Sequence, residues 1–528
     1  MFAVGATEWS PRLFCTTIAV LLAVWYWSWS RSRFVRLINA IPGPKGLPFL
    51  GNLFDVNIGY DRIFHKVIFE WTQKYDGIFR LWLTHYSYVV ISSPELIEPI
   101  LSCPIIGPKP KECDAIKDCV GDSLGFLGGE EWKQRRRMIA PAFHNQILNG
   151  FIDTFNEKSV EFARCLDEAV EAHKDVEFDI MPMMTRFALD ILCETTMGRK
   201  SNNEEKKKAY LENTMAIHRL NMERILKPWL QIKWIFKMSA LGRLSTYYIA
   251  AAHAFCNEVI EDRRQFLKEE KEKQANQSVD GDVVNNNIEQ DSDLYSSRKR
   301  PAFLDTLLQA SEENPDFTDA QIRDEVSIFM IAGHETVAIS FAKFLYLMAK
   351  HPEHQQLMVD ELAEVFGDSN RPCTSNDFAQ LKYLDCCIKE TMRLYPGLPI
   401  MLRSIPVDTQ AGDYTIPKGA TAVINLYATH HNPSFFPDPE SFKPERFFPE
   451  NSIGRHPYAF IPFSAGPRSC IGQKYAMYEM RVVMANLLRQ FRFSVSDPSA
   501  PLEIPSVAIA LKARNGVRLI ASRRSSFP

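Results

Sequence analysis

The chain has 528 residues, 46% of them hydrophobic and 12% aromatic, which is enough to bury a large core. Its formal net charge of −3 argues against a polyanion as the main partner. The eleven cysteines include no C-x-x-C pair, which argues against a zinc site of the usual spacing, and their odd number in a large chain is typical of a reducing compartment.

The first segment with a clear pattern is the uncharged run LFCTTIAVLLAVWYWSW at residues 13–29. A helix of this length spans about 26 Å, the short end of a membrane span. A cleaved signal peptide is the alternative, but the run ends in an interfacial aromatic belt and lacks a small-residue cleavage site. We therefore predict a membrane anchor at residues 1–30. The arginines that follow it, Arg31, Arg33 and Arg36, predict a cytosolic catalytic body.

The body should begin after a short linker. Residues 31–52 are first basic and then rich in proline and glycine, and they predict a stiff connection to a catalytic domain at residues 53–528. Residues 77–84 and 87–92 alternate like the two strands of a hairpin. Beyond them the helical period dominates, except at residues 268–300, a polar stretch that predicts a disordered insert.

A long helix is predicted from Thr318, where TDAQ forms a capping box with Gln321, to Lys350 ahead of a proline. It is apolar almost all round, which predicts a helix through the middle of the protein. Its centre contains AGHET, with Glu335 and Thr336 at the end. Burying these polar groups costs free energy, which suggests that they have a function. A helix kink in which the Thr336 hydroxyl bonds a carbonyl one turn back explains them equally well.

A second helix, LKYLDCCIKETMRLYP, should stop at Tyr395 ahead of its proline. Glu390 and Arg393 lie three residues apart on one face of it, a spacing also typical of an ordinary surface ion pair. Farther along the chain, the sequence PERF places Arg446 in a proline-rich loop.

A basic and aromatic segment, RILKPWLQIKWIFKM at residues 224–238, suits a membrane interface. Basic side chains alternate there with apolar ones: Arg224, Lys227, Lys233 and Lys237 with Leu226, Trp229, Trp234 and Phe236. A solvated helix face is the other interpretation of the same pattern.

The last pattern surrounds Cys470 in PFSAGPRSCIGQ, where glycines and prolines fix the backbone path ahead of a helix-compatible run. A cysteine at a helix N-terminus favours the thiolate, which is either a nucleophile or a metal ligand.

Together these motifs resemble, in order and over essentially the whole chain, those of the cytochrome P-450 haem-thiolate enzymes. The cysteine motif F-x-x-G-x-R-x-C-x-G is met by Phe463, Gly466, Arg468, Cys470 and Gly472. The E-x-x-R pair is met by Glu390 and Arg393, with Arg446 as the third member of a salt-bridged triad. W-x-x-x-R is met by Trp132 and Arg136, and A/G-G-x-D/E-T by Ala332, Gly333, Glu335 and Thr336.

The resemblance implies a mainly α fold with small β-sheets and a haem b whose iron is bound by the Cys470 thiolate. It further implies that Phe463 shields the sulfur and that Gly466 and Gly472 let the backbone approach the macrocycle. The propionates would be held by Arg468, Arg136, Trp132 and Arg403.

On the opposite haem face, the resemblance assigns proton delivery to Glu335 and Thr336. Val337 departs from the Thr or Ser common at its place in the family, which weakens the expected water network. Three stretches further resemble the family-four branch: RRRMIAPAFHNQILNGFIDTFNEKS, EVSIFMIAGHET and PFSAGPRSCIGQKYAMYEMR. Many members of that branch carry a glutamate at the place of Ala332, and this glutamate can form an ester to a haem methyl. Without that carboxylate, the haem should be held noncovalently.

The better-known members of that branch hydroxylate fatty acids, and the apolar substrate implied here is a fatty acid, a hydrocarbon, another lipid or a xenobiotic. Eight residues in usual substrate-contact regions are nearly all apolar, a composition that core packing explains as well: Ile328, Ile331, Ala332, Leu398, Ile400, Met401, Val507 and Ile509.

The implied partners are an NADPH-dependent cytochrome reductase, cytochrome b5 and the endoplasmic reticulum membrane. Two other functions remain open from the sequence. One is a haem-thiolate peroxide isomerase that needs no reductant, which an intact Glu335–Thr336 pair argues against. The other is a non-catalytic haem sensor.

Overall fold

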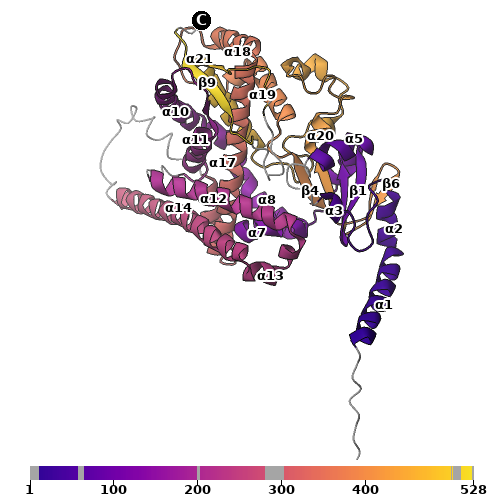
Figure 1. Ribbon diagram of the computed structural model, residues 1–528. Coiled ribbons are helices and arrows are strands. Elements are labelled where there is room, and N and C mark those ends of the chain that lie inside the picture. The colour runs from indigo at the N-terminus through magenta and orange to yellow at the C-terminus, as the bar shows by residue number, and fades with distance from the viewer. Residues whose placement is uncertain are drawn as a thin grey trace, which may run out of the picture.

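The computed structural model describes residues 11–56, 65–198, 203–279, 302–500, 502 and 513–525. Figure 1 shows a body built mostly of helices, with small sheets at its sides and a helix, α1, that projects from it. The fold is therefore mainly α with small β-sheets, as the sequence predicts.

The helices are bounded as follows: α1 Pro11–Ser30, α2 Arg33–Ala40, α3 Leu53–Val56, α5 Trp71–Lys74, α6 Pro94–Leu101, α7 Asp114–Val120, α8 Gly129–Ile139, α9 Asn145–Asn149, α10 Ile152–His173, α11 Met181–Thr195, α12 Glu204–Leu226, α13 Lys233–Met238, α14 Ala240–Val279, α16 Phe303–Glu313, α17 Asp319–Lys350, α18 Pro352–Phe366, α19 Lys382–Leu394, α20 Leu426–His430 and α21 Gln473–Gln490. Two short 3-10 helices also enter the argument below: η4 Pro228–Gln231 and η6 Pro444–Phe447.

The strands form three small sheets. The largest has the order β1-β2-β7-β4, from β1 Ile78–Leu83, β2 Tyr86–Ile91, β7 Thr421–Asn425 and β4 Ile400–Ser404. Its first pair is the predicted hairpin, with Phe79 opposite Val90, and β2 runs parallel to β7. The others pair β3 Phe178–Asp179, β9 Arg518–Arg523 and β8 Phe491–Ser494 in that order, and β5 Thr409–Ala411 with β6 Tyr414–Ile416.

The helix α17 runs through the middle of the body, where Figure 1 shows it between α11 and the sheet side. Its capping box is the predicted one, because Gln321 N–H donates to Thr318 Oγ1 and Thr318 N–H donates to Gln321 Oε1. Gly333 allows the close packing of α11, since a Cβ there would lie 2.8 Å from Leu192 Cδ1. The predicted central helix is therefore confirmed at both ends.

The N-terminal helix α1 carries exposed apolar side chains, among them Phe14, Leu21 and Trp25. Within the described ranges, α17 alone is long and apolar enough to cross a membrane, and most of its apolar window is buried inside the protein. The apolar part of α1, Phe14–Ser30, is shorter.

The segment that follows α1 packs against the body. Ile38 and Ile41 are fully buried, and Gly51 forms a β-bridge with Leu83. Part of the predicted linker therefore contributes to the core around the sheet, while its role in fixing the angle of α1 stays a prediction.

Two sequence predictions need correction. The polar stretch at residues 268–300 begins as helix, because α14 continues to Val279; residues 280–301 lie outside the described ranges. In the predicted interfacial segment, Arg224 is buried and bonds Asp118 at 2.6 Å, so that it is not a surface cation. The neighbouring Trp229 and Trp234 are exposed.

Candidate active site

The loop that carries Cys470 leads directly into α21, as the sequence predicts. Its backbone closes on itself, because Cys470 N–H donates to Phe463 O at 2.8 Å and Ser469 N–H donates to Gly466 O at 3.0 Å. Gly466 has a φ of +71°, and a Cβ there would lie 1.9 Å from Leu101 O. Only glycine fits this position without moving the neighbouring backbone. The loop geometry thus fixes the place of the sulfur.

The Cys470 side chain is accessible to a water-sized sphere, yet it lies deep among protein atoms. Burial raises the pKa of the Cys470 thiol, while the backbone N–H of Gly472 and the Arg136 guanidinium act in the opposite direction. Burial therefore outweighs the expected preference for the thiolate at a helix N-terminus. A thiol in such a place becomes a thiolate when a metal cation binds the sulfur, since coordination displaces the proton.

Three cations gather beside one pocket: Lys109, Arg403 on β4, and Arg468 of the cysteine loop. Burial, reinforced by neighbouring cations, lowers the pKa of Lys109 to about 7 and that of Arg468 to about 10. Burial lowers the pKa of Arg403 to about 10 as well. Arg468 Nε and Nη2 have no hydrogen-bond partner among the described residues. No carboxylate belongs to the described lining of this pocket.

Buried cations without a counter-charge are unfavourable unless an anion joins them. The cluster therefore fits a ligand with two carboxylates, such as the propionates of haem. The sequence implied Arg403 and Arg468 in this role through the family resemblance. It gave no signal for Lys109, which stands in a proline-rich loop outside every motif.

The other two residues expected at the propionates lie nearby, on α8. Trp132 is buried, and the Arg468 and Arg136 guanidinium carbons lie 5.4 and 5.9 Å from its ring centroid. Arg136 donates to Ser469 O at 2.9 Å. Arg136 thus connects α8 to the carbonyl that precedes Cys470. Phe463 packs, partly buried, against the main core, and Gly472 lies with its Cβ position 3.9 Å from Cys470 Sγ.

Glu335 and Thr336, the acid and the hydroxyl residue of AGHET, lie in the middle of α17. Thr336 Oγ1 donates to Ala332 O at 2.8 Å, which is the carbonyl bond one turn back that the alternative interpretation predicted. Glu335 is buried and its carboxylate lies 3.1 Å from His218 Nδ1 on α12. Sequence reasoning missed His218, because a lone histidine on a long helix carries no spacing signal. Val337 is buried.

Glu390 and Arg393 are both fully buried, so the surface ion-pair interpretation is wrong. Arg393 donates to both carboxylate oxygens of Glu390, at 2.7 and 2.8 Å. Arg446 Nε lies 3.4 Å from Glu390 Oε1, close enough for an ion pair although it is not aligned for a hydrogen bond. Arg393 also donates to the carbonyls of His430, Pro439 and Ser441. The triad therefore fastens α19 to the segments before the cysteine loop.

Six of the eight expected substrate contacts lie in the described part of the chain, and their role stays a prediction. Ile328 and Ile331 pack partly buried against the main core, while Ala332 is exposed between two half-buried residues. Leu398 is partly buried. Ile400 and Met401 pack into the small clusters around the β1-β2-β7-β4 sheet. Val507 and Ile509 lie outside the described residues.

Comparison with known proteins gives a consistent result. The family model described as Cytochrome P450 matches residues 41–517. Cytochrome P450 4c3 of Drosophila melanogaster is 38% identical over 509 residues, which cover 95% of this chain and 92% of that protein. Cytochrome P450 4V2 of Mus musculus is 35% identical over 514 residues, or 96% and 94% of the two chains. Cytochrome P450 4V2 of Homo sapiens is 36% identical over 473 residues, or 88% and 86%.

Proposed function

This chain belongs to the cytochrome P450 family, in its family-four branch, and is a haem-thiolate monooxygenase; on this basis we propose its substrate class, its electron donors, and the residues that bind the haem and deliver protons. The substrate is apolar: a fatty acid, a hydrocarbon, another lipid or a xenobiotic. The electrons come from NADPH through a cytochrome reductase, with cytochrome b5 as a second donor. The catalytic domain works on the cytosolic side of the endoplasmic reticulum membrane, held there by α1.

The observation that carries the residue assignment is the charge around the cysteine loop. Lys109, Arg403 and Arg468 are cations beside one pocket whose described lining has no carboxylate, and a haem placed with its iron at Cys470 brings two. We assign Cys470 as the protein ligand of the iron. The three cations, together with Trp132 and Arg136, bind and orient the propionates.

When bound, a thiolate-ligated haem supplies the activation of dioxygen and the transfer of one oxygen atom to the substrate. The chain's own part on the opposite face is to hold and move protons. The Thr336 hydroxyl donates to Ala332 O, so its oxygen lone pairs stay available to accept a proton donor. Glu335 holds an exchangeable proton site, and its contact with His218 connects that site to α12. This pair supports proton delivery from the α12 side.

The membrane assignment is supported by the exposed apolar surface of α1 and by the arginines after it. Arg33 and Arg36 lie on α2, just beyond the apolar stretch. Their position favours a cytosolic body. Two family-four relatives match 95% and 96% of this chain.

Oxygen consumption tests the proposed reaction. Purified protein mixed with a microsomal reductase and NADPH should consume oxygen faster when an apolar substrate is added, with product formed in proportion. A peroxide isomerase would instead turn over a lipid hydroperoxide without NADPH, and a sensor would bind haem with no turnover. Either of those results would overturn the proposal.

The substrate class has a separate test. Fatty acids, alkanes and steroids should be titrated into the purified protein, and the change of haem spin state followed in the absorption spectrum. We expect a high-spin shift with long-chain lipids. If no apolar compound changes the spectrum while polar ones do, the substrate assignment is wrong.

A further inference from the structure

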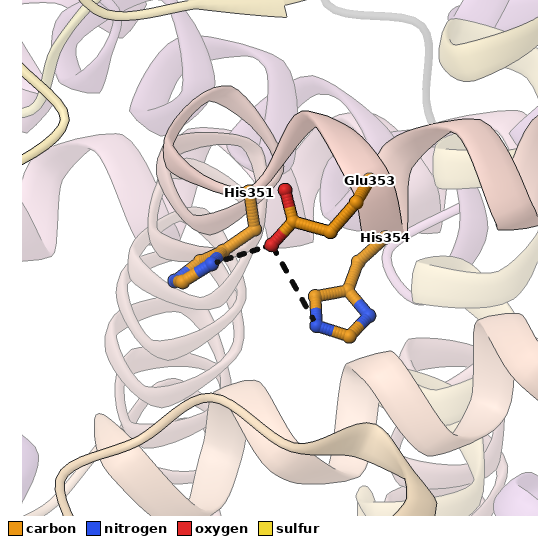
Figure 2. Close-up of side chains that lie close together, drawn as sticks. All are labelled: His351, Glu353 and His354. Carbon is orange, nitrogen blue, oxygen red and sulfur yellow. Dashed lines mark hydrogen bonds and ion pairs between the residues drawn. The ribbon is translucent and has the colours of Figure 1, made fainter.

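A second cluster of ligating side chains lies at the corner where α17 ends and α18 begins. Figure 2 shows His351 and His354 on either side of Glu353, with one nitrogen of each ring joined to the same carboxylate oxygen. They come from the consecutive residues HPEH, in which Pro352 is the first residue of α18. Neither the anchor, the haem site nor the salt-bridged triad uses this cluster.

The spacing of the three ligand atoms is close to that of a metal site. His351 Nδ1 lies 3.2 Å from Glu353 Oε1, and His354 Nε2 lies 4.0 Å from the same oxygen. All three atoms lie within 4.8 Å of one another. In a tetrahedral zinc site with bonds of about 2.0–2.1 Å, neighbouring ligand atoms are about 3.3 Å apart. The His351–Glu353 spacing already matches this value, and the exposed Glu353 carboxylate can move toward His354 without disturbing either ring.

The hydrogen bond at His354 Nδ1 orients the ring so that Nε2 can bind a metal. The Tyr383 hydroxyl lies 2.6 Å from His354 Nδ1 and 3.3 Å from Glu445 Oε1. With the hydroxyl donating to the carboxylate, it accepts the Nδ1 proton, and this leaves the Nε2 lone pair facing Glu353. Histidines that bind metals are typically fixed in this way by a chain that ends in a carboxylate.

The two imidazole rings are also held in place by packing. Phe442 stacks on His351, with centroids 5.2 Å apart and ring planes 24° apart, and meets His354 edge-on at 5.3 Å. The side chains of His351 and His354 are only 26% and 15% exposed, whereas that of Glu353 is 61% exposed. The site is thus rigid on its imidazole side and open to water on its carboxylate side.

We propose that His351, Glu353 and His354 bind a zinc ion, with water as the fourth ligand. Two imidazole nitrogens and one carboxylate oxygen are a ligand set that zinc accepts in tetrahedral geometry, whereas magnesium and calcium prefer oxygen ligands. The ion bridges the end of α17 and the start of α18. Through Tyr383 and Glu445 it is connected to α19 and to η6, which also carries Arg446 of the triad. The ion would therefore stabilise the packing of segments that are distant in sequence.

Metal analysis of the holoenzyme tests the proposal, with the haem iron as an internal standard. The protein should be dialysed against zinc buffered in the micromolar range and then against metal-free buffer, and its zinc and iron measured together. We expect about one more zinc per iron in the wild type than in the His354→Ala variant. The matched control is His65→Ala, which removes an exposed histidine 3.1 Å from Glu70, and it should bind as much zinc as the wild type.

Zinc bound elsewhere, for example by cysteine thiols, would be equal in all three proteins, and that result would overturn the site. A Tyr383→Phe variant keeps every ligand but removes the hydroxyl that orients His354, and we expect zinc affinity to fall about 10- to 100-fold. Zinc should also raise the unfolding midpoint of the wild type and of His65→Ala, but not that of His354→Ala. An unchanged affinity in Tyr383→Phe, or an equal midpoint shift in His354→Ala, would contradict the proposal.

Discussion

At the scale of single residues, the protein atoms around Cys470 raise the pKa of its thiol, so a metal that binds the sulfur would displace the proton. We predict that Cys470→Ser abolishes the red-shifted Soret band of the reduced carbon monoxide complex, because that band requires thiolate ligation. Difference spectroscopy measures it directly. Persistence of the band in the variant would assign the iron ligand to another residue.

Thr336 already has a bond to Ala332 O within its own helix, so the role of its hydroxyl needs a test that separates structure from chemistry. Thr336→Ala should retain haem but form roughly tenfold less product per NADPH, with the lost electrons appearing as peroxide or water. Thr336→Ser restores the hydroxyl and should recover most of the coupling. If Thr336→Ala couples as well as the wild type, the hydroxyl has only the structural role.

Ala332 has no carboxylate to offer the haem and is exposed on α17, between two half-buried residues. We predict that acid and organic solvent extract the haem completely, so that denaturing mass spectrometry finds only the mass of the polypeptide. Ala332→Glu should give some protein that is heavier by one haem after turnover. Ala332→Gln has a similar shape without the carboxylate and should not. A haem adduct on the wild-type chain would refute the noncovalent assignment.

At the scale of elements, patterns that depend on neighbours in sequence were predicted well. The capping box at Thr318, the end of α17 at Lys350 and the hairpin of β1 and β2 follow from local periodicity and local bonds. Contacts between distant elements were not predictable from one chain: the His218–Glu335 pair joins α12 to α17, and Lys109 donates to Leu402 O across 293 positions. Such residues have no local spacing to mark them.

In the segment at residues 224–238, too, the local pattern was predictable from the sequence but the contacts with the rest of the fold were not. Its composition predicted an interfacial element, yet Arg224 and Phe236 point inward, with the guanidinium 3.9 Å from the ring centroid. The exposed apolar side chains of the segment include the aromatic pair Trp229, on η4, and Trp234, on α13, which are 58% and 65% exposed.

We predict that protein lacking residues 1–30 still binds phospholipid vesicles in part, and that Trp229→Ala combined with Trp234→Ala reduces this binding severalfold. Vesicle flotation measures it. Ile453→Ala removes an apolar side chain that is 83% exposed on another loop, and should bind as the parent does. If the double variant binds equally well, the segment is a solvated helix face.

At the scale of the whole molecule, buried charges join parts of the chain that are far apart in sequence. Glu390 and Arg393 are fully buried, and their partners include carbonyls of residues 430, 439 and 441 and the side chain of Arg446. The resemblance to the family predicted the triad, but the local spacing of Glu390 and Arg393 was equally typical of a surface pair. Burial, which only the assembled fold determines, decides between them.

The same region should make the protein sensitive to acid. Burial lowers the pKa values of the neighbouring His430 and His431 to about 3 each, with Arg393 among the further causes. Ile461 N–H donates to His430 Nε2 at 3.0 Å, which requires a neutral ring and holds the chain just before the cysteine loop. Because the unfolded chain takes up these protons near its ordinary pKa of 6.5 and the folded chain does not, stability is full above about pH 6.5 and falls progressively toward about pH 3.

Each histidine should contribute a loss of up to roughly 1.4 kcal/mol per pH unit in that window. His430→Gln keeps an acceptor for Ile461 N–H but cannot be protonated, so we expect its urea midpoint to fall about half as steeply as that of the wild type between about pH 6 and about pH 4. His85→Gln, at an exposed histidine, should retain the wild-type slope. The Soret band and the protein fluorescence should be followed together, because protonation of His430 releases the segment that leads to Cys470. If His430→Gln loses stability with acid as steeply as the wild type, the acid sensitivity arises elsewhere in the molecule.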